Sequence, residues 1–503
     1  MTSLKPRPEY SDEELAILYP PSLQLQQVQL ILRHGERTPV NARFKNAGLH
    51  ADWPYCEAAR NFRDVILSAD RSWDTLRWRR RLETFGAGDN PVLSMGPQGQ
   101  IDAVCQPGEL TDLGRQTTLA LGERTRRLYV DQLGFLPKTL ESGGTVHLRA
   151  TPIQRALESV QQAFTCLYPS SARAPNFQPP DIVTRSFQDE TLFPNEGGCK
   201  RFAELSAAFA DRAAKLWNKS PEMAYINKRI GKWMPEKSPV IKVDSHPRLS
   251  GIMDTVNATL AHGPSTKLPK EFYDEKVVSN IDRICREEWF AGYQESQEYR
   301  TLGIGGLVGD VTQRMMEKAI GAAIPKTGAL ITLSGCHDTT LAGLLTALGA
   351  FEYSKNKWPN FTSSIAIELF QRKDTATTSN TKTASNVLDT STSWWSSLFT
   401  TKSASTVPTA RLPLGQLLAT DKQNLGGYYV RLRYNDTPLT IPNCRPAGKH
   451  LDGDESFCTL AAFKEVADEF TPRNWKEQCT EHLGEPAMKS VIERPLGITD
   501  DVV

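Results

Sequence analysis

Three short apolar runs in this chain lead directly into charged side chains, and this layout constrains the fold more than any other feature. The runs are residues 28–32, 145–148 and 330–333. Their β-branched and aliphatic residues are typical of strands, and helical patterns follow the second and third runs. Strands followed by helices indicate an α/β domain, whose ligands lie at the carboxyl ends of the strands. We therefore expect the charged residues after these strands to meet in one pocket.

The first run ends in the heptapeptide RHGERTP, at residues 33–39. Guanidinium groups fit phosphate oxygens with two parallel hydrogen bonds, so Arg33 and Arg37, together with Arg149 after the second run, predict a phosphate site. A neutral imidazole is a competent nucleophile, and neighbouring cations keep it neutral. The heptapeptide therefore predicts phosphoryl transfer through His34. The alternative is a loop histidine with a structural role.

The third run leads into His337 and Asp338. His337 can donate to phosphoryl oxygens, and Asp338 can protonate the leaving alcohol and then activate water. Asp338 could instead only begin the following helix, where an acidic residue is favourable. For Arg155 we favour a structural ion pair on its helix over a place at the border of the pocket. No metal or other cofactor is expected, because the arginines supply positive charge.

Other patterns predict the rest of the architecture. A helix is expected over 115–130, and another follows a capping Thr151. Residues 187–325 read as a mostly helical cap, and 41–105 as an irregular, partly helical insertion. The remaining expectations are two antiparallel strands at 365–370 and 428–434, with a disordered Ser/Thr-rich loop at 373–408 between them.

The net charge, the N-terminal sequence and the cysteines indicate which binding partners and which cellular compartment to expect. The net charge of +1 over 503 residues gives no indication of nucleic-acid binding. The N-terminus lacks a signal-like apolar core and no run is long enough to span a membrane, which predicts an intracellular protein, cytoplasmic or mitochondrial. Cys444 and Cys458 could be bridged, although reduced thiols are favoured in such a compartment. Four apolar residues in the Ser/Thr-rich loop could touch a membrane or fold back; they are Trp394, Trp395, Leu398 and Phe399.

Four segments together resemble the histidine acid phosphatases of the histidine phosphatase superfamily, branch 2. They read LILRHGERTP, LTDLGRQTTLALGERTRRLYV, VHLRATPIQRALESVQ and SGCHDTTLAGLLTALG. Residues 120–124, 192–195 and 357–361 are most similar to the lysophosphatidic acid phosphatase type. The resemblance implies one domain over residues 1–503, with a phosphoglycerate-mutase-like three-layer α/β fold, a mainly parallel sheet and an inserted helical cap. It also implies that His34 is phosphorylated, that Asp338 donates the proton, and that phosphate is bound by Arg33, Arg37, Arg149 and His337.

Several functions remain open at this level. The first is an acid phosphatase that hydrolyses small phosphate monoesters, lysophosphatidate among them. A phytase acting on inositol phosphates is the alternative within the family. A mutase or a kinase-coupled inositol-phosphate enzyme is less well supported, because Asp338 directly after His337 and the long helical insertion favour the acid phosphatase branch. A non-catalytic scaffold is less well supported, because all the expected catalytic groups are present.

Overall fold

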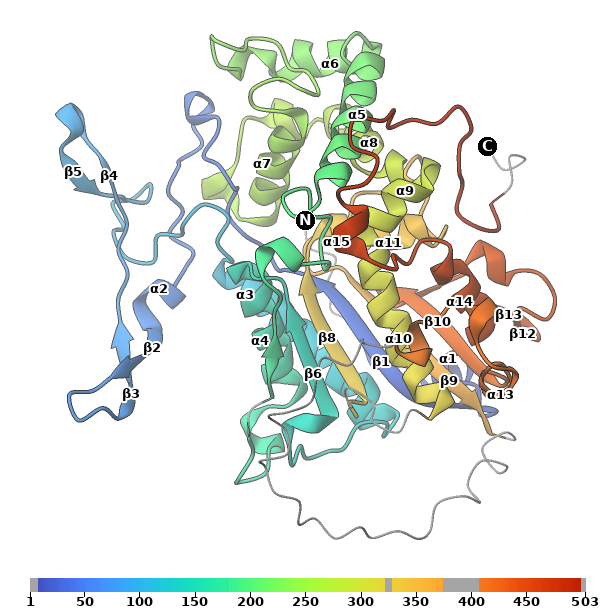
Figure 1. Ribbon diagram of the computed structural model, residues 1–503. Helices are drawn as coiled ribbons and strands as arrows, with labels where there is room; N and C mark the ends of the chain where they lie inside the picture. The colour runs from blue at the N-terminus through green and yellow to red at the C-terminus, as the bar shows by residue number, and fades with distance from the viewer. Residues whose placement is uncertain (1–7, 179, 322–327, 374–406, 499–503) are drawn as a thin grey trace.

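A computed structural model describes residues 8–178, 180–321, 328–373 and 407–498 (Figure 1). The segment expected to be a disordered loop, 373–408, lies almost entirely outside these residues. So do the four apolar residues considered for membrane contact: Trp394, Trp395, Leu398 and Phe399. Membrane contact through them therefore stays a prediction. Among the described residues, no helix has the length and hydropathy needed to cross a bilayer.

The main sheet runs in the order β12-β13-β10-β9-β1-β8-β6-β7, with β11 paired to β10. The strands are β1 Leu23–Arg33, β6 Val146–Ala150, β7 Ile182–Val183, β8 Ile331–Cys336, β9 Ser364–Arg372, β10 Tyr428–Tyr434, β11 Thr437–Leu439, β12 His450–Leu451 and β13 Asp454–Thr459. Strands β1, β8, β6 and β7 are parallel, whereas β9 and β10 are antiparallel, as predicted. The parallel strands form the core of the mixed sheet, and the expected fold class is confirmed.

Alternating side chains of β1 belong to two different hydrophobic cores. Leu30 and Leu32 pack with α3 (Asp112–Arg126) and α4 (Gln154–Leu167). Ile31 belongs to a larger core formed with α10 (Gly306–Ile320), α11 (Asp338–Ala347) and α14 (Leu460–Asp468). Because neighbouring residues of a strand point to opposite faces, the sheet is covered on both sides, which gives three layers. The shorter helices are α1 Asp12–Leu18, α13 Ala419–Asn424 and α15 Trp475–Gln478.

Helices dominate the stretch between β7 and α10. In Figure 1 they form a group above the sheet. They are α5 Lys200–Trp217, α6 Pro221–Ile230, α7 Leu249–Ala261, α8 Glu275–Glu295 and α9 Gln297–Arg300. Helix α7 reaches the loop after β1, because its Asp254 pairs with Arg37 at 2.7 Å. The helical group therefore forms a roof over the carboxyl ends of the parallel strands.

The region expected to be irregular and partly helical contains two β-hairpins instead. Strand β2 (Phe62–Leu67) pairs with β3 (Trp73–Trp78), β4 (Glu83–Phe85) pairs with β5 (Pro91–Leu93), and α2 (Ala58–Asn61) is a single turn. The hairpins project from the body (Figure 1). Nearly all their side chains are exposed. No buried face imposes an alternation of apolar and polar residues, so the pattern that identifies strands is missing from the sequence.

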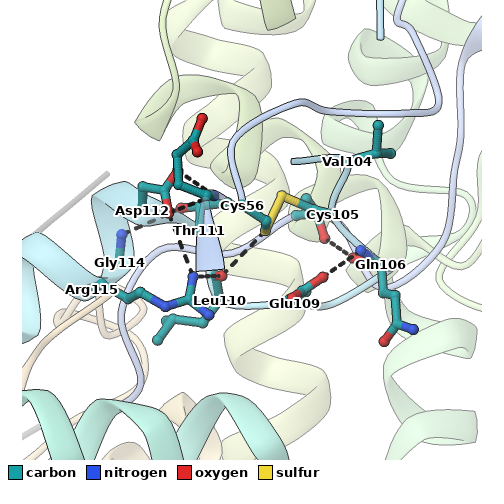
Figure 2. The surroundings of a disulfide bond; sticks show 12 residues. Cys56, Val104, Cys105, Gln106, Glu109, Leu110, Thr111, Asp112, Gly114 and Arg115 are labelled. Carbon is teal, nitrogen blue, oxygen red and sulfur yellow. Dashed lines mark hydrogen bonds and ion pairs between the residues drawn. A yellow bond between two sulfur atoms is a disulfide. The ribbon is translucent and has the colours of Figure 1, made fainter. Parts of the chain in front are cut away.

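Three disulfides correct the expectation of reduced thiols at Cys444 and Cys458. These two residues are bridged, and Cys56–Cys105 and Cys199–Cys479 are bridged as well. Figure 2 shows that Cys56–Cys105 closes the base of the hairpin region beside the start of α3. There the backbone N–H of Glu57 donates to the carboxylate of Asp112 at 3.0 Å. The expectation failed because it rested on the predicted intracellular compartment and not on the distance between the two thiols.

Candidate active site

The heptapeptide lies where β1 leaves the sheet, next to the ends of β8 and β6. Arg33 is in register with Cys336, and Ala150 with Gly335, so the three strands end side by side. The backbone N–H of His34 donates to the Cys336 carbonyl at 3.0 Å. The structure therefore brings the residues after β1 and β8 together, as the sequence predicts.

Two glycines allow the heptapeptide to cross the start of α3. A Cβ atom at Gly35 would lie 2.3 Å from the Gly114 carbonyl oxygen, and one at Gly114 would lie 2.1 Å from the Glu36 oxygen. No side chain fits at such distances. The crossing is fixed further by hydrogen bonds from the Thr111 N–H to the Glu36 carbonyl, 3.0 Å, and from the Gly35 N–H to the Ser159 hydroxyl, 3.1 Å.

The ring of His34 is buried and held in one tautomer. Its Nδ1 lies 2.8 Å from the carbonyl oxygen of Gly35, which can only accept a hydrogen bond. Nδ1 therefore carries the proton, and the lone pair resides on Nε2. Burial lowers the pKa of His34 well below its ordinary range, and nearby cations add to this effect. The largest charge contributions come from Arg155, then Arg37 and Arg33.

Arg33 and Arg37 flank this ring and are tied to carboxylates. Arg33 pairs with Asp338 at 2.7 Å and donates to the Pro359 carbonyl at 2.6 Å. Its guanidinium carbon lies 4.1 Å from the centre of the Phe361 ring. Both arginines have a buried Nε without a hydrogen-bond partner among the described residues. Donor capacity therefore remains for an anion in the pocket.

Arg149, in contrast, is bound to two carboxylates on other segments. Its guanidinium lies 2.7 Å from Glu190 and 3.2 Å from Asp310 of α10. Neighbouring residues of a strand point to opposite faces, and Arg149 points away from the core that holds Leu148. The cations that act most strongly on His34 do not include it. The structure thus does not group Arg149 with the other residues that the sequence assigns to phosphate.

Arg155, for which the sequence favoured a structural ion pair over a place at the border of the pocket, acts electrostatically on both histidines of the site. It lies in the first turn of α4, and its charge lowers the pKa of both His34 and His337. Burial lowers its own pKa to about 10, so it stays a cation in acid. Its buried Nε has no hydrogen-bond partner among the residues described. One sequence feature could have indicated this role: Arg155 lies in the first turn of a helix that follows a strand, at the same edge of the sheet as His34.

His337 faces His34, with ring centres 5.5 Å apart. Its Nε2 lies 3.1 Å from the Thr151 hydroxyl. Thr151 therefore supports the site, and Ile153 occupies the cap position of α4 that the sequence assigned to Thr151. Burial, followed by the charge of Arg155, lowers the pKa of His337 to about 3. Like His34, His337 is thus neutral in mildly acidic solution.

Asp338 combines a helix-terminal position with contacts in the pocket. Its Oδ2 accepts a hydrogen bond from the Trp358 indole N–H at 2.9 Å and pairs with Arg33. Burial raises the pKa of this carboxyl, but the Arg33 charge and the Trp358 hydrogen bond outweigh it. Asp338 therefore has a pKa below its ordinary value in the ligand-free protein.

A cavity of about 450 Å³ opens from these residues toward the helical roof. Arg33, Arg37 and Asp338 lie at its inner end. One wall of the cavity is apolar, with residues from the helical group and from loops at the edge of the sheet. They are Val40, Met253, Trp289, Trp358 and Phe361. Two further arginines in the lining are paired with carboxylates, Arg43 with Asp254 at 3.6 Å and Arg248 with Glu288. The cavity therefore has a cationic inner end and a largely apolar outer part, where Arg43 shares Asp254 with Arg37.

Comparisons with known proteins agree with this geometry. Residues 24–387 match the family described as the histidine phosphatase superfamily, branch 2. A probable acid phosphatase of Schizosaccharomyces pombe is 36% identical over 471 residues, which cover 94% of this chain and 97% of that protein. The human lysophosphatidic acid phosphatase type 6 is 26% identical over 52% of this chain and 57% of its own length. A Hafnia alvei phytase in complex with tartrate has the same fold, with a TM-score of 0.52 and 13% identity over 92% of this chain and 99% of that one.

Proposed function

Since the chain belongs to the histidine phosphatase superfamily, branch 2, and is an acid phosphatase of that superfamily, we propose that it hydrolyses phosphate monoesters through a phosphohistidine on His34. The observation that carries this proposal is the state of the His34 ring. Nδ1 is bound to the Gly35 carbonyl, and burial together with the surrounding cations keeps the ring neutral. Nε2 is therefore a nucleophile even in acid.

Phosphate binding is assigned to the cations that surround this nitrogen. Arg33, Arg37 and Arg155 hold the phosphoryl oxygens, and His337 adds a neutral donor. Guanidinium groups stabilise the charge that spreads over the phosphoryl oxygens during transfer. Arg155 takes the role that the sequence gave to Arg149, because Arg149 is already engaged by Glu190 and Asp310. This assignment makes Arg155 the third arginine of the site.

The reaction then proceeds in two steps. The Nε2 lone pair of His34 attacks phosphorus, the bond from phosphorus to the ester oxygen breaks, and the departing oxygen takes a proton from Asp338. In the second step the Asp338 carboxylate removes a proton from water. The oxygen of that water attacks phosphorus, the P–N bond breaks, and inorganic phosphate leaves.

Asp338 must carry a proton for the first step, although its pKa is depressed in the free protein. Arg33 is the largest cause of that depression. An incoming phosphate dianion competes for the Arg33 guanidinium and places negative charge near Asp338. Both effects raise the pKa of the carboxyl, so substrate binding itself promotes protonation of the acid.

The lining of the outer cavity favours a substrate whose leaving alcohol carries an apolar group. Trp289, Trp358 and Met253 offer apolar contact, and Arg248 is neutralised by Glu288. A phosphate monoester with one acyl chain, such as lysophosphatidate, matches these surfaces. An inositol phosphate is the second candidate, because Arg43 and Arg248 line the same cavity.

A substrate panel at several acidic pH values separates the two candidates. We expect a higher kcat/KM for lysophosphatidate than for phytate. We also expect Trp289→Ala to lower kcat/KM for lysophosphatidate by about tenfold, because it removes a large apolar contact. Trp73→Ala, on the exposed hairpin, is the matched control and should leave both values unchanged. Faster turnover of phytate than of lysophosphatidate at every pH would favour an inositol phosphate as the substrate.

The compartment is a separate question. The three disulfides support an oxidising compartment, because such bonds are rare where thiols are kept reduced. This differs from the intracellular location that the N-terminal sequence predicts, and we propose the oxidising compartment.

A further inference from the structure

A second cavity, of about 510 Å³, shares no lining residue with the catalytic one. It lies between the segment that precedes the helical group, the start of α10, and the residues around α15. The charged residues of its lining are Arg185, Asp189, Asp310, Arg411, Arg473 and Lys476. Four of these side chains are cations and two are carboxylates, so the lining has a formal charge of +2.

One buried carboxylate at the base of this cavity is shared by three guanidinium groups. Asp310 is 3.2 Å from Arg149 and 2.6 Å from Arg185, and it also pairs with Arg411. Its side chain is 9% exposed. A carboxylate offers about four acceptor positions, whereas three guanidinium groups carry about fifteen N–H donors. Asp310 therefore cannot engage all of these donors. Glu190 accepts from Arg149, Thr191 from Arg185 and Gln313 from Arg411, which still leaves donors on the two lining arginines.

Further positive charge surrounds this core. Lys476 pairs with Asp189 at 2.7 Å, and both side chains are partly exposed. Arg473 is exposed and has no carboxylate partner within the described part of the chain. Behind the cavity, Arg314 is close enough for its charge to lower the pKa of Asp310. The cations thus outnumber the carboxylates from the buried base to the solvent-exposed mouth.

We infer that this cavity is a second anion site, which binds a phosphate group outside the active centre. Planar guanidinium groups with unused donors match tetrahedral phosphate oxygens better than they match a halide. The concave lining and the buried Asp310, which orients two of the lining arginines, distinguish the site from scattered surface cations. Inorganic phosphate and a phosphate monoester carry the same group, and both are ligands of this class.

Equilibrium dialysis of the full chain against radiolabelled inorganic phosphate tests the inference. We expect two phosphates per chain, one in each cavity. The double variant Arg473→Gln, Lys476→Gln should bind the second phosphate at least about tenfold more weakly, because it loses two charged donors at the mouth. The double variant Lys219→Gln, Arg445→Gln removes the same charge from exposed positions elsewhere and should still bind two.

A second arm separates the two sources of the phosphate group. His34→Ala, which should not hydrolyse esters, is dialysed against labelled glycerol phosphate and against inorganic phosphate, and binding of either ligand at the second cavity supports the site. One phosphate per chain in the wild type together with no ester at the second cavity would overturn it, as would an unchanged affinity for the second phosphate in the mouth variant. A thermal unfolding midpoint equal to that of the wild type verifies that each variant is folded. Because stoichiometry is measured without turnover, this result is independent of whether His34 is the nucleophile.

Discussion

At the scale of single residues, the site depends on keeping one imidazole neutral among cations. Burial and three guanidinium groups all disfavour a proton on His34. The hydrogen bond to Gly35 decides which nitrogen is left for attack. These are separate contributions, so a variant can change the pKa of the nucleophile without changing its orientation.

Arg155→Gln tests this separation. Removal of the guanidinium removes a charge that disfavours the imidazolium, so the pKa of His34 rises. A larger fraction of His34 is then protonated and inactive at low pH. The acidic limb of the kcat profile should therefore move to higher pH, and kcat/KM should fall by about 10²-fold because a phosphate donor is lost.

The contrast is Arg149→Gln, which should leave the acidic limb in place, since Arg149 is not among the main charges around His34. Equal shifts in both variants would contradict the assignment of Arg155 to the site.

The sequence predicted which residues after β1 and β8 lie together, and it favoured Arg149 over Arg155 for a geometric reason. Arg33, His34, Arg37, His337 and Asp338 lie together because they follow two adjacent parallel strands. For β6 the sequence did not reveal which face of the strand meets the pocket. Arg149 is on the strand itself and points to α10, whereas Thr151, just after the strand, contacts His337, and the next cation toward the pocket is Arg155 in the first turn of α4.

At the scale of elements, the contact between the heptapeptide loop and α3 is a backbone contact. It exists because Gly35 and Gly114 have no side chains. The loop therefore lies closer to the helix than it could if Gly35 or Gly114 carried a side chain. This proximity holds His34 in place against the ends of β8 and β6.

Gly114→Ala should destabilise the protein by at least about 2 kcal/mol, because the new Cβ would collide with backbone that cannot move aside. Urea unfolding followed by circular dichroism measures this change. Gly144→Ala is the matched control, since its Cβ would meet only the Ser142 hydroxyl oxygen at 3.8 Å. A loss at Gly114 no larger than that at Gly144 would contradict the close approach.

The elements differ in how well the sequence predicted them. The strands β9 and β10 are buried and were predicted with their antiparallel pairing. The hairpins of β2 to β5 were missed, because both of their faces are exposed and no hydrophobic period marks them. Burial, and not strand formation itself, produces the pattern that can be read in a sequence.

At the scale of the whole molecule, disulfides connect distant parts of the chain. Cys199–Cys479 joins the start of α5 to the segment after α15, across a separation of 280 residues. Cys444–Cys458 closes a loop with a separation of only 14. The sequence could not predict the first pairing, because it depends on how the C-terminal segment returns to the helical group.

The two bridges should contribute unequally to stability. In the chain-entropy description, the longer loop stabilises by about 2–3 kcal/mol more than the shorter one. Cys199→Ser, Cys479→Ser should therefore lower the unfolding midpoint further than Cys444→Ser, Cys458→Ser. Denaturant unfolding of both variants beside the oxidised wild type measures the difference. Equal midpoints would show that chain entropy does not govern these bridges.

The most direct test of the mechanism is to trap the covalent intermediate. The protein is mixed with an aryl phosphate in acid, quenched within one turnover into alkali, where phosphohistidine survives, and analysed by mass spectrometry. We expect one added phosphoryl group on the peptide that contains His34, and none in His34→Ala, which should also release no phosphate. A wild-type protein that turns over without label at His34, or a His34→Ala variant that keeps its activity, would contradict it.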